Sequence, residues 1–429
     1  MRPKREYLQL LFFLPALLLL LLQGCRDPGS EKPGEAARSI PAVDSLILHE
    51  VQAGHIPGAV ARVQQGDSVL HERAYGVARK FGYGLKPVAD PPQMTTAHLF
   101  DLASLTKVCA TTFAVMMLVD EGKVGLDDPV YRYLPEFDSG AKRRITVRHL
   151  LTQSAGLYRW KPTYYYARNP EERYRYLAGL PLRYRVVKAR QYSDLGFMLL
   201  GDIVRRVGGR PLDRYLQERL YEPLQLEHTL FNPLSHGIDR EKIAATSHGN
   251  PFERQMVYDD DFGYRVEADP ASWDGWREYT LQGEVNDGNA WYTHRGVAGH
   301  AGLFSTAEEI QALLTLLLNK GQFDDKQMVS EQVTEAFLTK DRYGNGLGWA
   351  MDPEIFSGRG VPEGSFGHTG FTGTSIVVMP KLDLSIILLT NRQNVGRNED
   401  GFYPDLGPLR QTLVDLVLAR VKAGSKTLN

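Results

Sequence analysis

The sequence predicts an α/β protein of the α+β type, in which an antiparallel sheet is flanked by terminal helices and a large helical lobe is inserted. Pairs of β-rich runs lie near both ends of the 429-residue chain, and an amphipathic helix pattern stands outside each pair. The long middle of the chain has mainly helical and loop patterns. Strands at the two ends of a chain commonly close one sheet, so the middle is expected to form a second lobe.

The N-terminal elements are a helix followed by a hairpin. Apolar residues recur at helical spacing over Ala42–Val51. Two β-rich runs follow, Ala59–Val63 and Val69–Tyr75, and Gln65-Gly66-Asp67 between them is a turn sequence. This order predicts that the helix covers one face of the sheet that the hairpin begins.

The C-terminal elements repeat that order in reverse. The runs Thr374–Met379 and Leu384–Leu389 predict a second hairpin across the turn Pro380–Asp383, and Leu409–Val421 is an amphipathic helix. Between the two sheet segments, helices are expected at Thr106–Glu121, Val147–Leu151 and Leu195–Val207. We therefore predict one domain over residues 41–424, with a sheet lobe at 41–103 and 303–424 and a helical lobe at 104–302.

The first 24 residues have the pattern of a lipoprotein signal peptide. Basic residues precede the apolar run Leu10–Leu22, which is short for a membrane-spanning helix. Leu22-Gln23-Gly24-Cys25 resembles a bacterial lipobox, which implies that Cys25 is lipidated; plain secretion is the alternative. Residues 25–40 are rich in charge, Pro and Gly and predict a flexible tether. The expected location is the cell envelope, lipid-anchored and facing the periplasm or the outer surface.

Composition excludes several classes of protein. The net charge of −1 gives no excess of positive charge that would indicate binding to nucleic acid. Two cysteines are too few for a fold that depends on several disulfides. The chain has no Gly-x-Ser-x-Gly elbow, P-loop or dinucleotide fingerprint. Asp259-Asp260-Asp261 can be a cation site or a solvated loop, and we expect the latter. No metal or cofactor is predicted, and the sequence leaves the oligomeric state open.

The first chemical motif is Ser104-Leu105-Thr106-Lys107. A serine hydroxyl needs a base to become a nucleophile, and residues at i and i+3 of a helix face the same way. Apolar neighbours can bury Lys107 and lower its pKa. Ser139 and Lys142 repeat the spacing in a polar, glycine-containing loop, where we expect nothing to desolvate the lysine. The structural alternative for Ser104 is a helix N-cap.

Two further motifs follow in the chain, Tyr192-Ser193-Asp194 and His368-Thr369-Gly370. A tyrosine beside a lysine can shuttle protons, and a glycine before a strand lets the backbone approach a substrate. Each motif also has a structural reading, in which Asp194 caps the helix that begins at Leu195 and His368 is an ordinary loop histidine.

Taken in order, the three motifs resemble the serine β-lactamases and penicillin-binding proteins, whose related class A set is Ser-x-x-Lys, Ser-Asp-Asn and Lys-Thr-Gly. The middle and last elements here resemble the class C branch, which includes D-alanyl-D-alanine carboxypeptidases, peptidases and esterases. The stretches 100–107, 150–157 and 302–306 are similar too, and the resemblance covers about residues 41–421. It implies a β-lactamase-like fold for the predicted sheet and helical lobe.

The resemblance implies a role for each motif residue. Ser104 would be the acylated nucleophile, and Lys107 would accept its proton or tune Tyr192 by charge. Tyr192 would shuttle a proton to the leaving group and later activate water. Asp194 would stand where the family has Asn, and His368 where it has Lys.

The oxyanion hole would be formed by the backbone N–H groups of Ser104 and Phe371. Four residues are expected to line the place where the substrate binds: Thr369, Gly370, Phe371 and His300.

The two departures from the family pattern, Asp for Asn and His for Lys, disfavour a dedicated β-lactamase, because His368 is a weaker cation for a substrate carboxylate. The stretches 249–253, 256–261 and 283–287 resemble D-alanyl-D-alanine carboxypeptidases and muropeptide amidases. The expected activity is acyl-enzyme hydrolysis of amide bonds in a small peptide or muropeptide. The alternatives are a broad esterase, a class C-type β-lactamase and a sensor that forms a stable acyl adduct.

Overall fold

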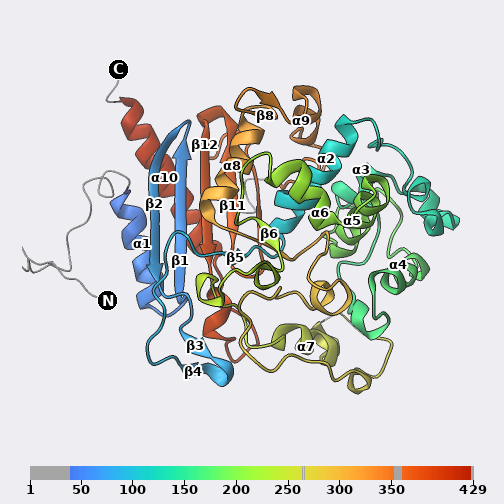
Figure 1. Cartoon of the computed structure of the whole chain (residues 1–429), viewed down its shortest axis with the longest axis horizontal. Helices are drawn as coiled ribbons and strands as arrows, with labels where there is room; N and C mark the ends of the chain where they lie inside the picture. The colour runs from blue at the N-terminus through green and yellow to red at the C-terminus, as the bar shows by residue number, and fades with distance from the viewer. Residues whose placement is uncertain (1–38, 263, 265, 352–359, 427–429) are drawn as a thin grey trace, which may run out of the picture. The chain divides into compact units, whose positions relative to one another are not determined.

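The computed structural model describes residues 39–262, 264, 266–351 and 360–426, and these belong to one unit of the chain (Figure 1). The predicted signal peptide, Cys25 and most of the predicted tether lie outside the described residues. Within the described ranges, we find no helix that combines the length and the apolar character needed to cross a membrane.

The central sheet joins the two ends of the described chain. Its strand order is β10-β11-β12-β1-β2, with all neighbours antiparallel. The pairing of β1 with β12 runs from Ala59 opposite Thr390 to Gln65 opposite Leu384. The two predicted hairpins and the antiparallel sheet are therefore confirmed. The strands are β1 (Gly58–Gln65), β2 (Ser68–Gly76), β10 (Phe366–Thr369), β11 (Ser375–Met379) and β12 (Leu384–Thr390).

The two faces of the sheet pack against different helices because successive side chains point to opposite sides of a strand. Ala59, Ala61 and Val63 share a core with α1 (Pro41–Gln52) and α10 (Gly407–Lys426), which contact each other. In Figure 1 these terminal helices lie together beside the sheet. On the other face, Val60 of β1 and Ile387 and Leu389 of β12 join the main core. There α8 (Ala307–Leu318) contacts both strands.

The segment predicted as the helical lobe is dominated by helices, with short strands that connect it to the sheet lobe. A three-stranded sheet has the order β5-β7-β6, and its strand β6 comes from the predicted helical lobe. The remaining elements are β3 (Phe81–Gly82), β4 (Lys86–Pro87), β5 (Phe100–Asp101), α2 (Thr112–Asp120), α3 (Val147–Leu151), α4 (Pro170–Gly179), α5 (Asp194–Gly208), α6 (Leu212–Leu216), β6 (Leu230–Phe231), α7 (Pro251–Tyr258), β7 (Leu303–Ser305), β8 (Gln322–Phe323), β9 (Lys326–Gln327) and α9 (Glu331–Phe337).

The helix predicted over Thr106–Glu121 is not regular. A π-helical turn spans Lys107–Thr111 before α2 begins. The Thr111 hydroxyl donates to the Gly299 carbonyl at 2.7 Å, so this wide turn is tied to a distant loop. Apolar periodicity does not reveal such a turn, which occurs frequently at functional sites.

A buried ion pair joins two helices of the helical lobe. Arg173 on α4 donates to both carboxylate oxygens of Asp202 on α5, at 2.6 and 2.8 Å. The side chains are 0% and 6% exposed. Since removal of one partner leaves the other charge buried and unpaired, the pair is costly to break.

We predict that Asp202→Ala lowers the free energy of unfolding by about 3–5 kcal/mol, because Arg173 is left unpaired in the core. Denaturant unfolding measures the loss. The control is Asp138→Ala, which removes the exposed ion pair with Arg143 and is expected to cost under about 1 kcal/mol. Equal losses in the two variants would contradict the prediction.

Candidate active site

Ser104 follows a strained turn at the end of β5. Ala103, the residue before it, has a φ of 46°, a left-handed conformation that is costly for a residue with a side chain. The buried carboxylate of Asp101 accepts the Ala103 N–H at 2.8 Å and the Asn286 N–H at 2.6 Å. Burial raises the pKa of Asp101 to about 6. The turn that presents Ser104 is therefore held by a carboxyl group that also fixes the loop at Asn286.

Lys107 is fully buried and makes three polar contacts. Its ammonium lies 2.7 Å from Asp194 Oδ1, and it donates to Ser104 Oγ and to the His300 carbonyl, both at 3.0 Å. An ammonium has three N–H donors, so this arrangement satisfies a charged lysine. Ser104 makes no side-chain cap of the helix in this arrangement, and its hydroxyl is engaged with Lys107 and Tyr192 instead.

Tyr192 completes the contact set around the Ser104 hydroxyl. Its phenol donates to Ser104 Oγ at 2.6 Å, and the Lys107 ammonium lies 4.9 Å from the centroid of its ring. The structure therefore brings the first two motifs into one hydrogen-bonded cluster, although 88 residues separate Ser104 from Tyr192.

The electrostatics of the cluster differ from the expectation that burial lowers the pKa of Lys107. Burial does act in that direction, but Asp194 and Tyr192 outweigh it and hold the pKa of Lys107 above its usual value. Burial also raises the pKa of Tyr192; the positive charge of Lys107 only partly opposes this. At neutral pH, both groups therefore favour their protonated forms.

The chain around Tyr192 is fixed by Gln153, which follows the end of α3. The Gln153 side chain accepts the Ser193 N–H at 2.9 Å, and the Gln153 carbonyl accepts the Gln191 N–H at 2.9 Å. The cap of α5 is Ser193, whose hydroxyl accepts the Gly196 N–H, so the reading of Asp194 as the cap is wrong. Asp194 is free to pair with Lys107 because its neighbour caps the helix.

The third motif lies at the end of β10 and is linked to the first. Gly370 leaves no room for a side chain, because a Cβ atom there would lie 2.1 Å from Thr374 Oγ1 and 2.5 Å from the Leu102 carbonyl. The hydroxyl of Thr374 donates to that carbonyl at 3.1 Å, and the hydroxyl of Thr372 donates to the Asp101 carbonyl at 2.7 Å. These bonds fix the backbone after Gly370 against the turn before Ser104.

His368 is buried and neutral. Burial lowers its pKa to about 3, and the positive charge of Lys107 adds to this effect. Its Nδ1 lies 2.8 Å from the Thr369 carbonyl, which fixes the proton on that nitrogen and leaves Nε2 as an acceptor. His368 therefore does not supply the positive charge of the lysine found in related motifs.

A cavity of about 350 Å³ opens at Ser104. Lys107 contacts Ser104 without lining this cavity. Eight residues predicted from the sequence line it: Ser104, Tyr192, Asp194, His300, His368, Thr369, Gly370 and Phe371. The structure thus gathers all the predicted motif residues at one place, either in the cavity wall or directly behind the nucleophile.

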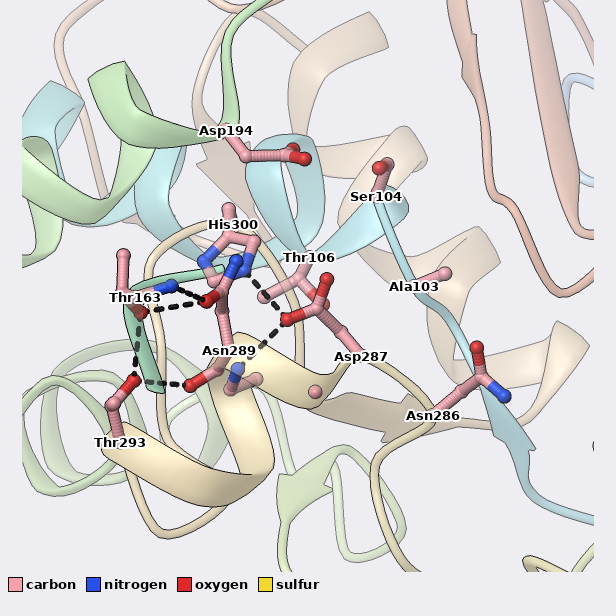
Figure 2. Close-up of polar contacts among 12 residues, drawn as sticks. Ala103, Ser104, Thr106, Thr163, Asp194, Asn286, Asp287, Asn289, Thr293 and His300 are labelled. Atoms are coloured by element: carbon pink, nitrogen blue, oxygen red, sulfur yellow. Dashed lines mark hydrogen bonds and ion pairs between the residues drawn. The ribbon is translucent and has the colours of Figure 1, made fainter. Parts of the chain in front are cut away.

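His300 contacts two neighbours at the site. Its carbonyl accepts from Lys107, and its Nε2 lies 2.9 Å from Asp287 Oδ1 (Figure 2). Although burial raises the pKa of Asp287, the pairing with His300 outweighs burial and lowers it. Asp287 is therefore an ionised carboxylate in the cavity wall.

Sequence reasoning did not predict several residues of the cavity wall, among them Arg392, Arg410 and Glu253. Burial lowers the pKa of Arg392, and burial together with Arg392 lowers the pKa of Arg410 to about 10. Both remain cations at neutral pH. The third residue, Glu253 of α7, is buried. Neither arginine belongs to a motif, and the resemblance of the stretch 249–253 gives Glu253 no role. Their positions in the fold assign all three to the site.

The second Ser-x-x-Lys pattern differs from its prediction in one respect. Lys142 is buried, with a lowered pKa, because it packs into the helical lobe and donates to the Ala178 carbonyl. The expectation that nothing desolvates it is wrong. Ser139 is exposed, however, and the buried Lys142 is engaged elsewhere.

Among the described residues, no group of three or more His, Cys, Asp and Glu side chains is arranged to hold a metal ion. Asp259-Asp260-Asp261 lies at the end of α7, where the Asp259 carboxylate accepts the Asp261 N–H at 3.0 Å.

Comparison with known proteins gives one family. The family model described as Beta-lactamase matches residues 43–405. A Bacillus subtilis strain 168 protein named N-acetylmuramyl-L-alanine amidase is 35% identical over 379 residues, which cover 84% of this chain and 82% of that protein. An Escherichia coli O157:H7 protein named "Putative D-alanyl-D-alanine carboxypeptidase" is 33% identical over 387 residues, which cover 85% of each.

The solved structure of a class C β-lactamase from Rhodobacter sphaeroides superposes with a TM-score of 0.61. It covers 89% of this chain and 100% of the other, at 20% identity, and therefore supports the fold alone. The fold, the family model and the two relatives agree: the chain belongs to the β-lactamase family, whose fold class C β-lactamases and penicillin-binding protein homologues share.

Proposed function

We propose that the protein is a serine hydrolase that cleaves amide bonds of cell-wall peptides through an acyl-enzyme on Ser104. The observation that carries the proposal is the convergence of Lys107 Nζ and the Tyr192 phenol on Ser104 Oγ, at 3.0 and 2.6 Å. A serine with two titratable groups on its hydroxyl, at the wall of a cavity, has the arrangement that nucleophilic catalysis requires. The names of the two relatives supply the substrate class.

In the proposed cycle, Ser104 Oγ attacks the amide carbonyl and forms a C–O bond. Tyr192 takes the serine proton and passes it to the amine nitrogen as the C–N bond breaks. A water molecule then attacks the acyl-enzyme, gives its proton through Tyr192 to Ser104, and releases the carboxylic acid. The overall reaction adds one water across the amide bond.

Lys107 acts as a fixed positive charge in this proposal. Its three contacts and its raised pKa favour the ammonium, which attracts a Tyr192 phenolate and holds the Ser104 hydroxyl in place. Of the two roles expected for Lys107, charge tuning is therefore better supported than proton acceptance.

The backbone N–H groups of Ser104 and Phe371 form the oxyanion hole in the proposal. Within the described part of the chain, neither N–H donates to a backbone carbonyl. The Gly370 carbonyl, which shares a peptide group with the Phe371 N–H, accepts the Gly373 N–H at 3.0 Å, and this bond fixes the orientation of that peptide. Preorganised donors of this kind stabilise the tetrahedral intermediate.

The proposed amide hydrolysis is tested by incubating the purified protein with a mixture of muropeptides and identifying the products by mass spectrometry. We expect Ser104-dependent release of amine products from amide bonds, either the peptide from the sugar acid or a terminal D-alanine from the peptide. Hydrolysis of simple esters without any amide cleavage would favour the esterase alternative. A single burst without turnover would favour the acyl-binding sensor.

We predict that Ser104→Ala abolishes turnover of ester and amide substrates, because it removes the hydroxyl that receives both contacts. The matched control is Ser139→Ala, which removes the serine of the second Ser-x-x-Lys pattern and should leave both rates unchanged. Steady-state assays and thermal melting of both variants are the measurement. Loss of activity in the Ser139 variant would place the site elsewhere.

We predict that Asp194→Asn moves the rising limb of kcat/KM to lower pH. The negative charge of Asp194 raises the pKa of Tyr192, whereas the positive charge of Lys107 lowers it. The Asn variant removes the carboxylate and keeps the lysine, so the phenol loses its proton at lower pH. The wild-type limb is expected on the alkaline side of neutral, because Tyr192 must lose its proton to act as a base. The test is to measure kcat/KM against pH for both forms with one ester substrate. A rising limb that stays at the same pH in the variant, or moves to higher pH, would contradict the prediction.

We also propose that the protein is anchored in the bacterial cell envelope by lipid on Cys25. The relatives with cell-wall names support the compartment. The run Leu10–Leu22 followed by Gly24-Cys25 supports the anchor.

Cys25→Ser is predicted to leave the precursor unprocessed or to release the protein from membranes, because lipid chains are required for stable anchoring. Fractionation and metabolic labelling with a fatty acid measure this. Recovery of unlabelled wild-type protein entirely in the soluble fraction would exclude the anchor.

A further inference from the structure

Part of the cavity beside Ser104 is walled by aromatic rings. The aromatic wall consists of Trp160, Phe252, Tyr264 and Phe371. Trp160 and Tyr264 meet edge to face, with ring centroids 5.7 Å apart, and the centroids of Phe252 and Phe371 are 5.1 Å apart. None of these side chains is needed for the proposed acyl transfer, so the aromatic wall calls for a different role.

Glu253 is a buried carboxyl group beside the aromatic wall. Its Oε1 accepts the Gly288 N–H at 2.7 Å, and its Oε2 accepts the Tyr164 hydroxyl at 3.1 Å. A Cβ atom on Gly288 would lie 2.2 Å from Oε2, so the carboxyl group is tightly enclosed. Among the described residues, no Lys, Arg or His lies within ion-pair distance of Glu253.

A buried carboxylate without a cation is costly, and the group avoids this cost by retaining its proton. Burial, followed by the negative charge of Asp287, raises the pKa of Glu253 to about 8. Both oxygens already accept hydrogen bonds from neutral donors, so the acid retains one O–H to donate. Glu253 and Asp287, neighbours in the cavity wall, thus differ in charge at neutral pH.

The position of Glu253 is reinforced from behind by further aromatic residues. Tyr164, its hydrogen-bond partner, is 4% exposed. The ring of Tyr164 packs against Trp273, Tyr292 and Trp276, with centroid distances of 4.7, 5.1 and 5.9 Å. Tyr164 and the rings packed against it therefore hold the carboxyl group of Glu253 in place.

We infer that the aromatic wall and Glu253 form a saccharide subsite, which binds an N-acylated amino sugar attached to the acyl side of the scissile amide. A pyranose ring has C–H groups that pack on aromatic rings, and its acetamido carbonyl is an acceptor for the O–H of Glu253. A neutral acid does not favour the ammonium group of a peptide, which makes a free peptide the poorer occupant. The inference rests on the proposed function and names the substrate class of the same site.

The experiment compares three probes with the full chain. The first is N-acetylmuramoyl-L-alanyl-D-isoglutamine, the second is the same dipeptide carrying only the lactoyl group, and the third is an activated acetate ester. The two amides present the same bond with and without the sugar, and the ester reports the acyl-transfer groups alone. The readout is the ratio of kcat/KM between the two amides.

We expect the sugar-bearing amide to be favoured by the wild type. Trp160→Leu and Glu253→Leu should each lower the ratio by about tenfold or more, since a buried hydrogen bond or a ring contact with the sugar is lost. Glu253→Gln should recover most of the loss, because an amide is neutral and still donates. Tyr258→Ala is the control: this residue is an exposed aromatic on α7, the helix of Glu253, and the ratio should not change.

Three results would overturn the inference. If Ser104 cleaves both amides and the ratio of their kcat/KM values is the same in the wild type and in every variant, the saccharide subsite is refuted and the proposed function stands. A loss in Glu253→Gln as large as in Glu253→Leu would show that Glu253 acts as an anion. Ester hydrolysis without cleavage of muropeptides or of either amide would refute the proposed function itself, and the subsite with it.

Discussion

The buried ammonium of Lys107 is the constraint on which the rest of the site depends. A fully buried positive charge is tolerated only when every N–H has a partner, and the three partners come from distant parts of the chain. Asp194 begins α5, the His300 carbonyl belongs to the loop before β7, and Ser104 follows β5. The pairing therefore fixes three segments relative to one another and places the Tyr192 phenol on the same hydroxyl.

The geometry around this charge is also held by hydrogen bonds at the turn before Ser104. Asp101 holds the left-handed turn at Ala103, and Thr372 and Thr374 tie the backbone after β10 to the same turn. The strain at Ala103 is sustained because several independent contacts determine it. On the cavity wall, His300 keeps Asp287 ionised while burial keeps Glu253 protonated, so one pocket holds carboxyl groups of different charge.

Much of the fold could be predicted from local sequence patterns, because alternation with a period of two and apolar helical spacing are visible in single segments. The predicted hairpins correspond to β1–β2 and β11–β12, and the motif residues meet at one cavity. What failed depends on contacts between distant segments. The pKa of Lys107 follows from the 2.7 Å approach of Asp194, the burial of Lys142 from its packing in the helical lobe, and the roles of Arg392, Arg410 and Glu253 from their place in the cavity wall.

The account requires that the acyl group is carried by Ser104. The most direct measurement is intact-mass analysis of the protein quenched in acid during turnover of an activated ester, followed by peptide mapping. The account predicts one acyl group per chain, on Ser104, absent from the Ser104→Ala protein and more abundant in early samples than after the substrate is exhausted. An acyl group on another residue, or one retained in the Ser104→Ala protein, would contradict it.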